Sequence, residues 1–266
     1  MKIGFVGGGN MAEAMLSSIL TRGISGLDEI RISDTLPARR DYLQSQYRVS
    51  VTPDNPVACQ GRDIVILAVK PQVLNDVMAG LKNQLTAEQL VISIIAGKSI
   101  NTLSLGLGHS CIVRSMPNTP AQIGEGMTVW TSTPSVTARQ RSYAASILGA
   151  MGLEIEVDDE KYLDMATAVS GSGPAYLFLF VESMIEAAVK LGFTAETAQK
   201  LVMQTLLGSA HLLHKSGRTP QELRRMVTSP GGTTAEAIAT FEKGGFTQLI
   251  AEAVKAAHLK AQKLGS

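Results

Sequence analysis

Residues 2–12 read KIGFVGGGNMA, a short apolar segment that runs directly into three glycines and then into a helical pattern. Within it, Gly7, Gly9 and Ala12 follow the spacing Gly-x-Gly-x-x-Ala between a strand and a helix. The first glycine allows the tight turn, the second lets the backbone approach a pyrophosphate, and the small third residue lets helix and strand pack closely. Because the N-terminus of a helix also favours anions, this stretch predicts a dinucleotide-binding turn.

The second predicted strand ends at Ser33 and Asp34, about 22 residues after Ala12. A carboxylate at this point accepts hydrogen bonds from the adenine ribose and disfavours a 2′-phosphate. Arg39 and Arg40 follow closely, and they could instead hold that phosphate or lie as solvated charges on a helix face. We therefore expect NADP or NAD as the cofactor, with Asp34 favouring the acceptance of NADH.

Short β-branched segments alternate with helical segments over the first 159 residues. Strands are predicted at 2–6, 29–33, 63–69, 90–94, 111–114, 127–131 and 153–157, and helices at 12–21, 38–46, 72–81 and 135–151. Continuous apolar strands separated by helices are typical of a parallel sheet that is covered on both faces. Right-handed crossovers then predict an α/β fold, with an N-terminal Rossmann-type doubly wound sheet over residues 1–159.

The pattern becomes all-helical after Asp159. Helices are predicted at 162–167, 175–191, 194–216, 219–226, 234–244 and 246–264, so that residues 160–266 form an all-helical domain for substrate binding and dimerisation. The helix at 175–191 is apolar nearly all round in its first two turns, and such a helix must be buried on every side. It is either a central core helix or a subunit interface, and the small size of the domain favours the interface.

Composition excludes several classes of protein. The 266 residues carry 24 Lys and Arg against 23 Asp and Glu, a net charge of +1, which lacks the basic footprint of a general nucleic-acid binder. Cys59 and Cys111 cannot build a disulfide framework, and His211 and His214 have no companion ligands for a metal. The N-terminus lacks the apolar core of a signal peptide, and the most apolar run, 175–181, is shorter than the about 20 residues that span a bilayer. We expect a cytoplasmic protein without a membrane segment.

Two further glycine clusters lie in the helical half, at residues 170–175 (SGSGPA) and 228–234 (TSPGGTT). Both place glycines and hydroxyl side chains just before a helix, where they either cap the helix or bind an anion. Capping needs one hydroxyl, whereas Ser229, Thr233 and Thr234 provide several donors, so we expect a small carboxylate there. Since no His, Cys or paired carboxylate accompanies the clusters, hydrolase triads and glycosidase pairs are unsupported.

With these motifs the chain resembles the pyrroline-5-carboxylate reductase family. Five motifs spread over nearly the whole chain carry the resemblance: GFVGGGNMA (4–12), AVKP (68–71), RSMPNTP (114–120), SGSGPAY (170–176) and TSPGGTT (228–234). The first motif occurs in many Rossmann enzymes. The last two together, in this order and at this separation, are specific to the family.

The resemblance implies an NAD(P)H-dependent oxidoreductase that transfers hydride to the imine carbon of 1-pyrroline-5-carboxylate and gives L-proline, the last step of proline biosynthesis. Together with Ser33 and Asp34, the implied cofactor site comprises Val6, Gly7, Gly8, Gly9, Asn10, Met11, Asn55, Ala68, Val69, Lys70, Pro71 and Ala96. The implied substrate site comprises Glu160, Ser229, Gly232, Thr233 and Thr234, with Thr234 as the catalytic position that hydrogen-bonds the ring nitrogen. The family also implies a dimer with intertwined helical halves, often assembled into a decamer, in which each active site combines the halves of two subunits.

Two positions depart from the family pattern. Asp34 stands where some members have a serine that binds the 2′-phosphate, and Met226 stands where others have an asparagine near the cofactor. Two alternatives to a pyrroline-5-carboxylate reductase are another Rossmann imine or β-hydroxyacid oxidoreductase, with Lys190 or Lys200 as its acid, and a non-catalytic dinucleotide sensor. Neither lysine lies in a glycine-rich motif, and a sensor needs no second anion site, so the reductase is favoured.

Overall fold

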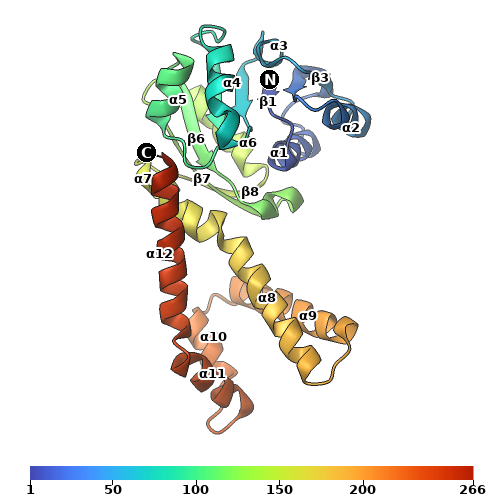
Figure 1. The fold of residues 1–266 in the computed structure, drawn as a ribbon, viewed down its shortest axis with the longest axis vertical. Coiled ribbons are helices and arrows are strands. Elements are labelled where there is room, and N and C mark those ends of the chain that lie inside the picture. Colours follow the sequence, from blue (N-terminus) through green and yellow to red (C-terminus); the bar gives the residue numbers. More distant parts are fainter. Residues whose placement is uncertain (266) are drawn as a thin grey trace. The chain divides into compact units, whose positions relative to one another are not determined.

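The computed structural model describes residues 1–265 and divides the chain into two compact units. The first unit comprises Met1–Ser172 together with the end of the chain from Ala256, and the second comprises Gly173–Lys255. Figure 1 labels the elements of both units.

One eight-stranded sheet organises the first unit (Figure 1). Its strands are β1 (Ile3–Val6), β2 (Ile30–Ser33), β3 (Ser50–Thr52), β4 (Ile64–Leu67), β5 (Leu90–Ser93), β6 (Ile112–Met116), β7 (Gly126–Ser132) and β8 (Gly152–Glu156). They lie in the order β3-β2-β1-β4-β5-β6-β7-β8, and β3 to β6 are parallel throughout. The strand order reverses between β1 and β4, which is the point where ligands bind in open α/β sheets.

Helices cover both faces of this sheet. They are α1 (Asn10–Thr21), α2 (Pro37–Tyr47), α3 (Asn55–Cys59), α4 (Leu74–Leu81), α5 (Ile100–Leu107), α6 (Ala138–Gly149) and α7 (Lys161–Ala166), with short 3₁₀ turns at Leu27–Glu29, Pro71–Val73 and Thr119–Ile123. Apolar residues of α1, α2 and α6 pack into one buried cluster, and those of α4 and α5 pack into another. Neighbouring residues of β1 divide between the two, since Phe5 belongs to the first cluster and Val6 to the second. The doubly wound sheet predicted from the sequence is therefore confirmed.

The direction of β7 differs from the expected parallel arrangement. It runs antiparallel to β6, while β8 runs parallel to β7. A parallel pair needs a crossover of a dozen or more residues, whereas the connection from β6 to β7 contains only the short Thr119–Ile123 turn. The chain therefore turns straight back on itself. The α6 helix then supplies the predicted crossover to β8.

Three short elements were not expected from the sequence: β3, α3 and α5. The α5 helix is defined by its ends, because the Ser99 hydroxyl accepts a hydrogen bond from the amide of Thr102, and Gly108 adopts a left-handed conformation with φ 65°. The two cysteines, Cys59 and Cys111, are free and buried, as expected.

The second unit is helical. It contains α8 (Gly173–Lys190), α9 (Ala195–Ser216), α10 (Pro220–Met226), α11 (Thr233–Lys243) and the first half of α12 (Phe246–Gly265). These bounds agree with the predicted helices to within two residues. Threonine N-caps explain two of the helix starts: Thr194 caps α9, and Thr219 forms a capping box with Glu222 at α10.

The SGSGPA cluster lies at the start of a helix, as predicted, since α8 begins at Gly173. Residues Thr167–Gly171 form a π-helical turn that directly follows α7, and Ser172 lies between this turn and α8. The hydroxyl groups of Ser170 and Ser172 donate to the carbonyl oxygens of Ala166 and Thr167 in the preceding turn. Both hydroxyl hydrogens are therefore used within the helical segment, so neither serine has a donor left for an anion.

The apolar helix is longer than the run at 175–181 indicated. Among the described residues, the continuous helical stretch Lys161–Lys190 is the one segment long and apolar enough, by length and composition, to cross a membrane. Only 6% of the most apolar 18-residue part of this stretch is buried, and Leu177, Phe178 and Leu179 are 54–65% exposed. The length of the run at 175–181 therefore does not by itself exclude a membrane span, and the expectation of a protein without one stays a prediction. The second unit does not enclose α8 as a core helix. Within Gly173–Lys255 the buried residues are Ala198 and Val202, both on α9.

Candidate active site

The glycine-rich turn follows β1 at the point where the strand order reverses. Gly7 adopts a φ of 95°, and its amide donates to the carbonyl of Ser33 at 2.9 Å. A Cβ atom on Gly7 would lie 2.8 Å from the carbonyl oxygen of Ala68 and 3.0 Å from Val69. Only glycine fits this turn, because both the backbone angle and the neighbouring β4 chain exclude a side chain.

The next two glycines have different surroundings. The amide of Gly8 donates to the carboxylate Oδ2 of Asp34 at 2.9 Å, and a Cβ atom on Gly8 would lie 2.7 Å from the Leu43 side chain. Gly9 is the N-cap of α1 in an extended conformation, and a Cβ atom there would meet nothing within 4 Å. The space above the first turn of α1 is therefore open where that helix presents its amides. This combination fits the pyrophosphate of a dinucleotide.

The end of β2 brings three more predicted cofactor residues together. The hydroxyl of Ser33 lies 2.7 Å from Oδ1 of Asn55 and 3.1 Å from the carbonyl of Phe5. Both carboxylate oxygens of Asp34 accept backbone hydrogen bonds, from Gly8 and, at 2.9 Å, from Leu36. Ser33, Asp34 and Asn55 therefore border the glycine turn directly.

Arg39 and Arg40 are held against the same turn. The Nε atom of Arg39 donates to the carbonyl of Gly8, and its guanidinium pairs with Glu13 of α1. Arg40 donates to the carbonyl of Asp34 at 2.7 Å. Both arginines are half-buried, so the interpretation as freely solvated charges is not supported.

The remaining predicted cofactor residues lie at the ends of β4 and β5. The amide of Ala68 donates to the carbonyl of Val6 at 2.9 Å, which joins the AVKP segment to β1. Lys70 is exposed at the start of the 3₁₀ turn that begins with Pro71. Ala96 is half-buried in the loop after β5. The predicted cofactor residues therefore gather at the carboxyl edge of one sheet, all within the first unit.

Glu160 lies at the start of α7, also in the first unit, and is tied to two other elements. Its Oε1 atom accepts a hydrogen bond from the amide of Ile100 at 2.7 Å and forms an ion pair with Nη1 of Arg114 at 2.7 Å. Arg114 projects from β6 and also pairs with Asp164 at 2.8 Å. Arg114 belongs to the RSMPNTP motif, but the motif alone indicates no role for it. The available signal was a charged residue in an otherwise apolar strand.

The TSPGGTT segment forms a tight loop in the second unit. Gly231 has a φ of 70°, and the amide of Gly232 donates to the carbonyl of Ser229 at 3.0 Å. Gly232 is the N-cap of α11, and among the described residues no side chain caps this helix start. Thr233 and Thr234 are its first two residues. Their hydroxyls and that of Ser229 are therefore not spent on capping, which favours the anion-binding interpretation.

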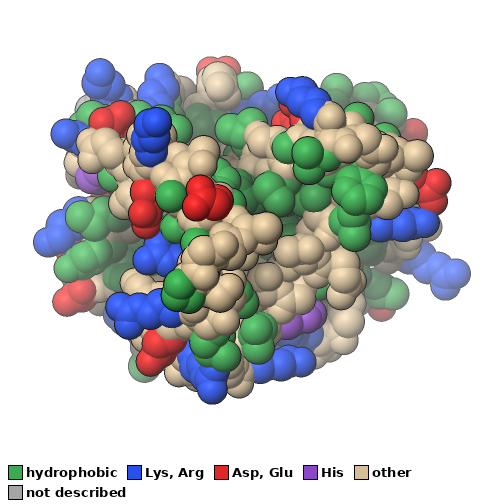
Figure 2. Space-filling view, turned by 90° about the horizontal axis from the view of Figure 1, so that it is seen from below, with side chains coloured by type: hydrophobic (Ala, Val, Ile, Leu, Met, Phe, Trp, Pro, Cys, Tyr) green, Lys and Arg blue, Asp and Glu red, His purple; other side chains and the backbone are tan. Residues whose placement is uncertain are grey.

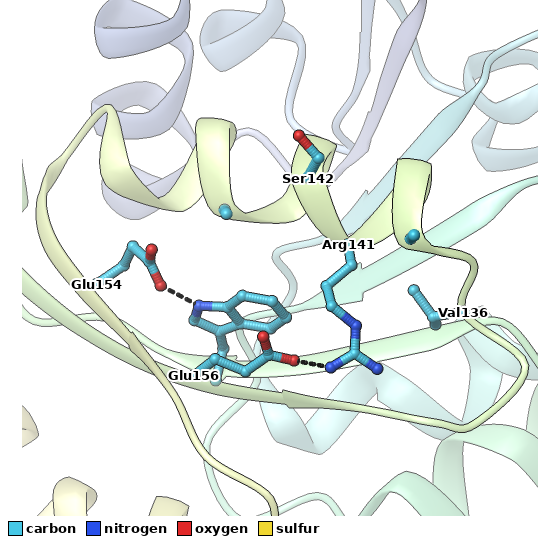
Figure 3. Close-up of a pocket in the computed structure, with 8 residues that line it drawn as sticks. Val136, Arg141, Ser142, Glu154 and Glu156 are labelled. Carbon is cyan, nitrogen blue, oxygen red and sulfur yellow. Dashed lines mark hydrogen bonds and ion pairs between the residues drawn. The ribbon is translucent and has the colours of Figure 1, made fainter.

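A separate hollow of about 600 Å³ lies between α6 and the strands β7 and β8 (Figure 3). Glu154 and Glu156 extend into it from β8, where they bind the indole of Trp130 and the guanidinium of Arg141, respectively. None of the predicted site residues lines this hollow. Within residues 1–265 the structure holds no group of three or more His, Cys, Asp or Glu side chains suited to a metal.

Comparison with known proteins identifies the family. The model of pyrroline-5-carboxylate reductase dimerisation matches residues 160–264, and the model of NADP oxidoreductase, coenzyme F420-dependent, matches residues 2–97. The chain is 43% identical to the pyrroline-5-carboxylate reductase of Synechocystis sp. over 265 residues, which cover 100% of this chain and 98% of the relative. It is 40% identical to that of Pseudomonas aeruginosa, over 99% of this chain and 96% of the relative. The chain belongs to the pyrroline-5-carboxylate reductase family.

Solved structures of the family have the same fold. A pyrroline-5-carboxylate reductase from Coxiella burnetii is 38% identical with a TM-score of 0.90, and the one from Plasmodium falciparum with NADP bound is 34% identical with a TM-score of 0.91. Each comparison covers 100% of this chain and 98% of the other. A prephenate dehydrogenase from A. aeolicus, at 16% identity and a TM-score of 0.57, shares the fold alone.

Family membership confirms the resemblance inferred from the five motifs. The chain is an NAD(P)H-dependent oxidoreductase of this family, and its helical half belongs to a self-associating domain. The β-hydroxyacid oxidoreductase and the non-catalytic sensor are thereby displaced as interpretations of the sequence.

Proposed function

We propose that the chain reduces 1-pyrroline-5-carboxylate to L-proline with NADPH or NADH, the last step of proline biosynthesis. The observation that carries this proposal is the 43% identity to the Synechocystis reductase over nearly the full length of both chains. The open, anion-favouring start of α1 and the uncapped Thr228–Thr234 loop support it independently.

The glycine turn, with Val6, Asn10 and Met11 beside it, would hold the pyrophosphate of the cofactor. Ser33, Asp34 and Asn55 would meet the adenosine, and Ala68, Val69, Lys70, Pro71 and Ala96 would line the remainder of the site. When bound, the reduced cofactor supplies the hydride. The protein's own contribution is to fix the nicotinamide and the imine at attack distance, which lowers the barrier by orientation.

The substrate is a small ring with a carboxylate and an imine nitrogen. Ser229, Gly232 and Thr233 would bind the carboxylate through hydroxyl and amide donors at the start of α11. Thr234 would hydrogen-bond the ring nitrogen. An aliphatic hydroxyl is a poor acid, so Thr234 positions the nitrogen, and the proton comes from water or from substrate that is already protonated. Glu160 would face the substrate with Oε2, since Oε1 is engaged by Arg114 and Ile100.

The helical residues 160–266 would form the dimerisation and substrate domain, and residues 1–159 the cofactor domain. The exposed apolar surface of α8 supports a dimer. Our proposal is that this dimer is intertwined, shares its active sites and assembles further into a decamer. We also propose that the enzyme is cytoplasmic and binds neither nucleic acid nor membrane; the net charge of +1 supports only the lack of a non-specific nucleic-acid partner.

One absorbance assay tests the reaction. Purified protein with pyrroline-5-carboxylate and NADPH or NADH should oxidise the cofactor and release proline. A preparation that binds the reduced cofactor but oxidises neither form would contradict the proposal and restore the dinucleotide sensor as an interpretation.

Thr234→Ala tests the substrate loop. We expect kcat to fall by about 10²-fold, because the ring nitrogen loses its hydrogen bond, while the Kd for NADPH stays within about twofold. Thr240→Ala is the matched control, because Thr240 is an exposed residue of the same helix and its hydroxyl donates to the carbonyl of Glu236 at 2.9 Å. Equal losses in turnover and in cofactor affinity would remove Thr234 from the substrate site.

A further inference from the structure

Arg114 carries a buried charge in the middle of a sheet. Its side chain is 5% exposed, and it projects from β6 onto α7, where it meets the carboxylates of Glu160 at 2.7 Å and Asp164 at 2.8 Å. Removing a guanidinium from water is unfavourable unless its hydrogen bonds are satisfied, so such a group is seldom kept for stability alone. A specific geometric role is the better account of it.

The two carboxylates around Arg114 have different surroundings. Asp164 alone would neutralise the guanidinium. Glu160 adds a second negative charge, and its Oε1 atom also accepts the amide hydrogen of Ile100 at 2.7 Å. Glu160 therefore joins three elements: β6 through Arg114, α7 through its own backbone, and α5 through Ile100.

Ile100 is the first residue of α5 and directly follows the loop 94–99, which carries Ala96 of the predicted cofactor site. At its other end this loop is fixed by a hydrogen bond from the amide of Ile94 to the carbonyl of Leu67, at 3.1 Å. The Ser99 hydroxyl already caps α5 by accepting from Thr102, so Glu160 is an additional restraint on the helix start. Both ends of the loop are thus held, one by β4 and one by Glu160.

The RSMPNTP motif, to which Arg114 belongs, also contacts the π-helical turn that follows α7. Asn118 donates from Nδ2 to the carbonyl of Ser170 at 3.0 Å, and its Oδ1 accepts from the amide of Met127 at 2.8 Å. The RSMPNTP stretch therefore fixes both ends of the helix–π-turn segment. Arg114 is the part of it that reaches toward the cofactor loop.

We infer that Arg114 is a positioning residue for cofactor binding, acting through Glu160 and the amide of Ile100 on the loop that carries Ala96. The inference rests on the proposed function, since it takes the dinucleotide as the ligand of that loop. In the same arrangement Arg114 fixes the direction of Oε2, the oxygen that Glu160 would offer to the substrate.

A double-mutant cycle tests this chain of contacts. Arg114→Lys keeps the charge but replaces the planar fork with a point charge that cannot serve both carboxylates with the same geometry. Glu160→Gln keeps an acceptor oxygen and removes the charge. We expect each variant to raise the Kd for NADPH, measured by nicotinamide fluorescence without substrate, by about fivefold. Because Arg114 and Glu160 act along one path, their effects should not multiply. The Kd for NADPH of the double variant should exceed that of the single variant with the higher Kd by no more than about twofold.

Asp164→Asn is the matched control. It perturbs the same guanidinium on the side away from Ile100, so we expect a lower Tm and a Kd for NADPH within about twofold of the wild type. Hydrogen exchange at the amide of Ile100 should become faster in Arg114→Lys and Glu160→Gln and stay unchanged in Asp164→Asn.

A lowered Tm with an unchanged Kd for NADPH in Arg114→Lys would overturn the inference and leave a purely structural ion pair, as would strictly additive effects in the double variant. If Arg114→Lys does not fold, an unchanged Kd in Glu160→Gln is sufficient to overturn it. Failure of the proposed function looks different: the wild type would then bind NADPH and leave pyrroline-5-carboxylate unreduced.

Discussion

Asp34 shows how one residue serves two purposes at the glycine turn. The sequence assigns it to the adenine ribose, and the structure adds that both of its oxygens already accept backbone hydrogens, from Gly8 and Leu36. In the proposed cofactor site its charge would disfavour a 2′-phosphate, while its two hydrogen bonds hold the backbone of the turn. Substitutions at this position must therefore separate charge from hydrogen bonding.

We expect Asp34→Ser to raise the preference for NADPH over NADH by about tenfold or more, because the repulsion of a 2′-phosphate is removed. The measurement is the ratio of kcat/KM for the two cofactors. Asp34→Asn, which keeps an acceptor near Gly8 without the charge, should shift the ratio in the same direction if repulsion is the cause. A ratio that moves only in Asp34→Ser would point to loop geometry, and no shift in either variant would exclude Asp34 from cofactor selection.

At this scale, the sequence predicts residues whose role depends on neighbours along the chain. Gly7 is predictable because a strand ends immediately before it. Asp34 is predictable because it directly follows the next predicted strand along the chain. Arg114 is not, because its partners Glu160 and Asp164 lie 46 and 50 residues further on. An isolated arginine in a strand does not indicate which element will cover it.

At the scale of the elements, the turn between β1 and α1 contains one glycine that the fold requires, Gly7, and one that it does not require, Gly9. A Cβ atom on Gly9 would meet nothing within 4 Å, and the φ of −66° suits any residue. Replacing Gly9 by alanine weakens the N-cap and costs about 0.5–1 kcal/mol of the free energy of unfolding. This cost is offset because alanine also lowers the conformational entropy of the unfolded chain. The fold therefore does not require glycine at position 9, which leaves the proposed binding of the pyrophosphate as the reason for it.

Gly9→Ala should consequently leave the Tm within about 3 °C of the wild type, while the Kd for NADPH rises by about tenfold or more because the methyl group occupies the place of the pyrophosphate. Calorimetry and nicotinamide fluorescence measure the two quantities. Gly7→Ala provides the contrast, since its φ of 95° and a contact at 2.8 Å with Ala68 should lower the Tm itself. Unchanged affinity in Gly9→Ala would mean that the phosphates bind elsewhere.

The α1 and α2 helices are joined through a single carboxylate. Burial raises the pKa of Glu13, but hydrogen bonds from Arg39, Tyr47 and Tyr42 outweigh it, so the pKa lies below its ordinary value of 4.5. A carboxyl group whose pKa is lowered by folding stabilises the protein fully above its unfolded pKa and loses that effect as the pH falls through the folded pKa.

We expect Glu13→Gln to lower the free energy of unfolding by about 1.5–3 kcal/mol between pH 5 and 8, the usual range for hydrogen bonds to a charged group. The difference from the wild type should shrink below pH 4.5 as the carboxylate is protonated. Denaturant unfolding at several pH values measures it, with Tyr42→Phe as a milder variant that removes one bond. A difference that persists unchanged at pH 3 would mean that charge plays no part.

Helix and strand positions were largely predictable because each element carries its own hydrophobic periodicity. The direction of β7, in contrast, was not predictable. Strand direction depends on what connects β6 to β7, and a 3₁₀ turn of five residues leaves no pattern that differs from a loop. The π-turn at Thr167–Gly171 was missed for a related reason. Its serines and glycines resemble a helix start, and their back-bonding to the preceding turn appears only in three dimensions.

For the whole molecule, the exposed surface of α8 demands a partner. Leu177, Phe178 and Leu179 expose more than half of their surface, and apolar side chains lie between charged ones on the face drawn in Figure 2. Such a surface fits either a second subunit or a membrane, since the stretch Lys161–Lys190 meets the length and composition of a membrane span. The dimerisation model that matches residues 160–264 favours the subunit.

Phe178→Asp decides between these two partners. A carboxylate cannot be buried in an apolar interface without a large penalty, so the variant should weaken self-association by about 10²-fold, measured by sedimentation at several concentrations. Leu105→Asp is the control, because Leu105 is 70% exposed against 65% for Phe178 but lies on α5, outside residues 160–264. The wild type should remain in the supernatant after ultracentrifugation without detergent. Recovery in the membrane fraction would instead assign α8 to the bilayer, and an unchanged mass in Phe178→Asp would place the dimer contact on another face.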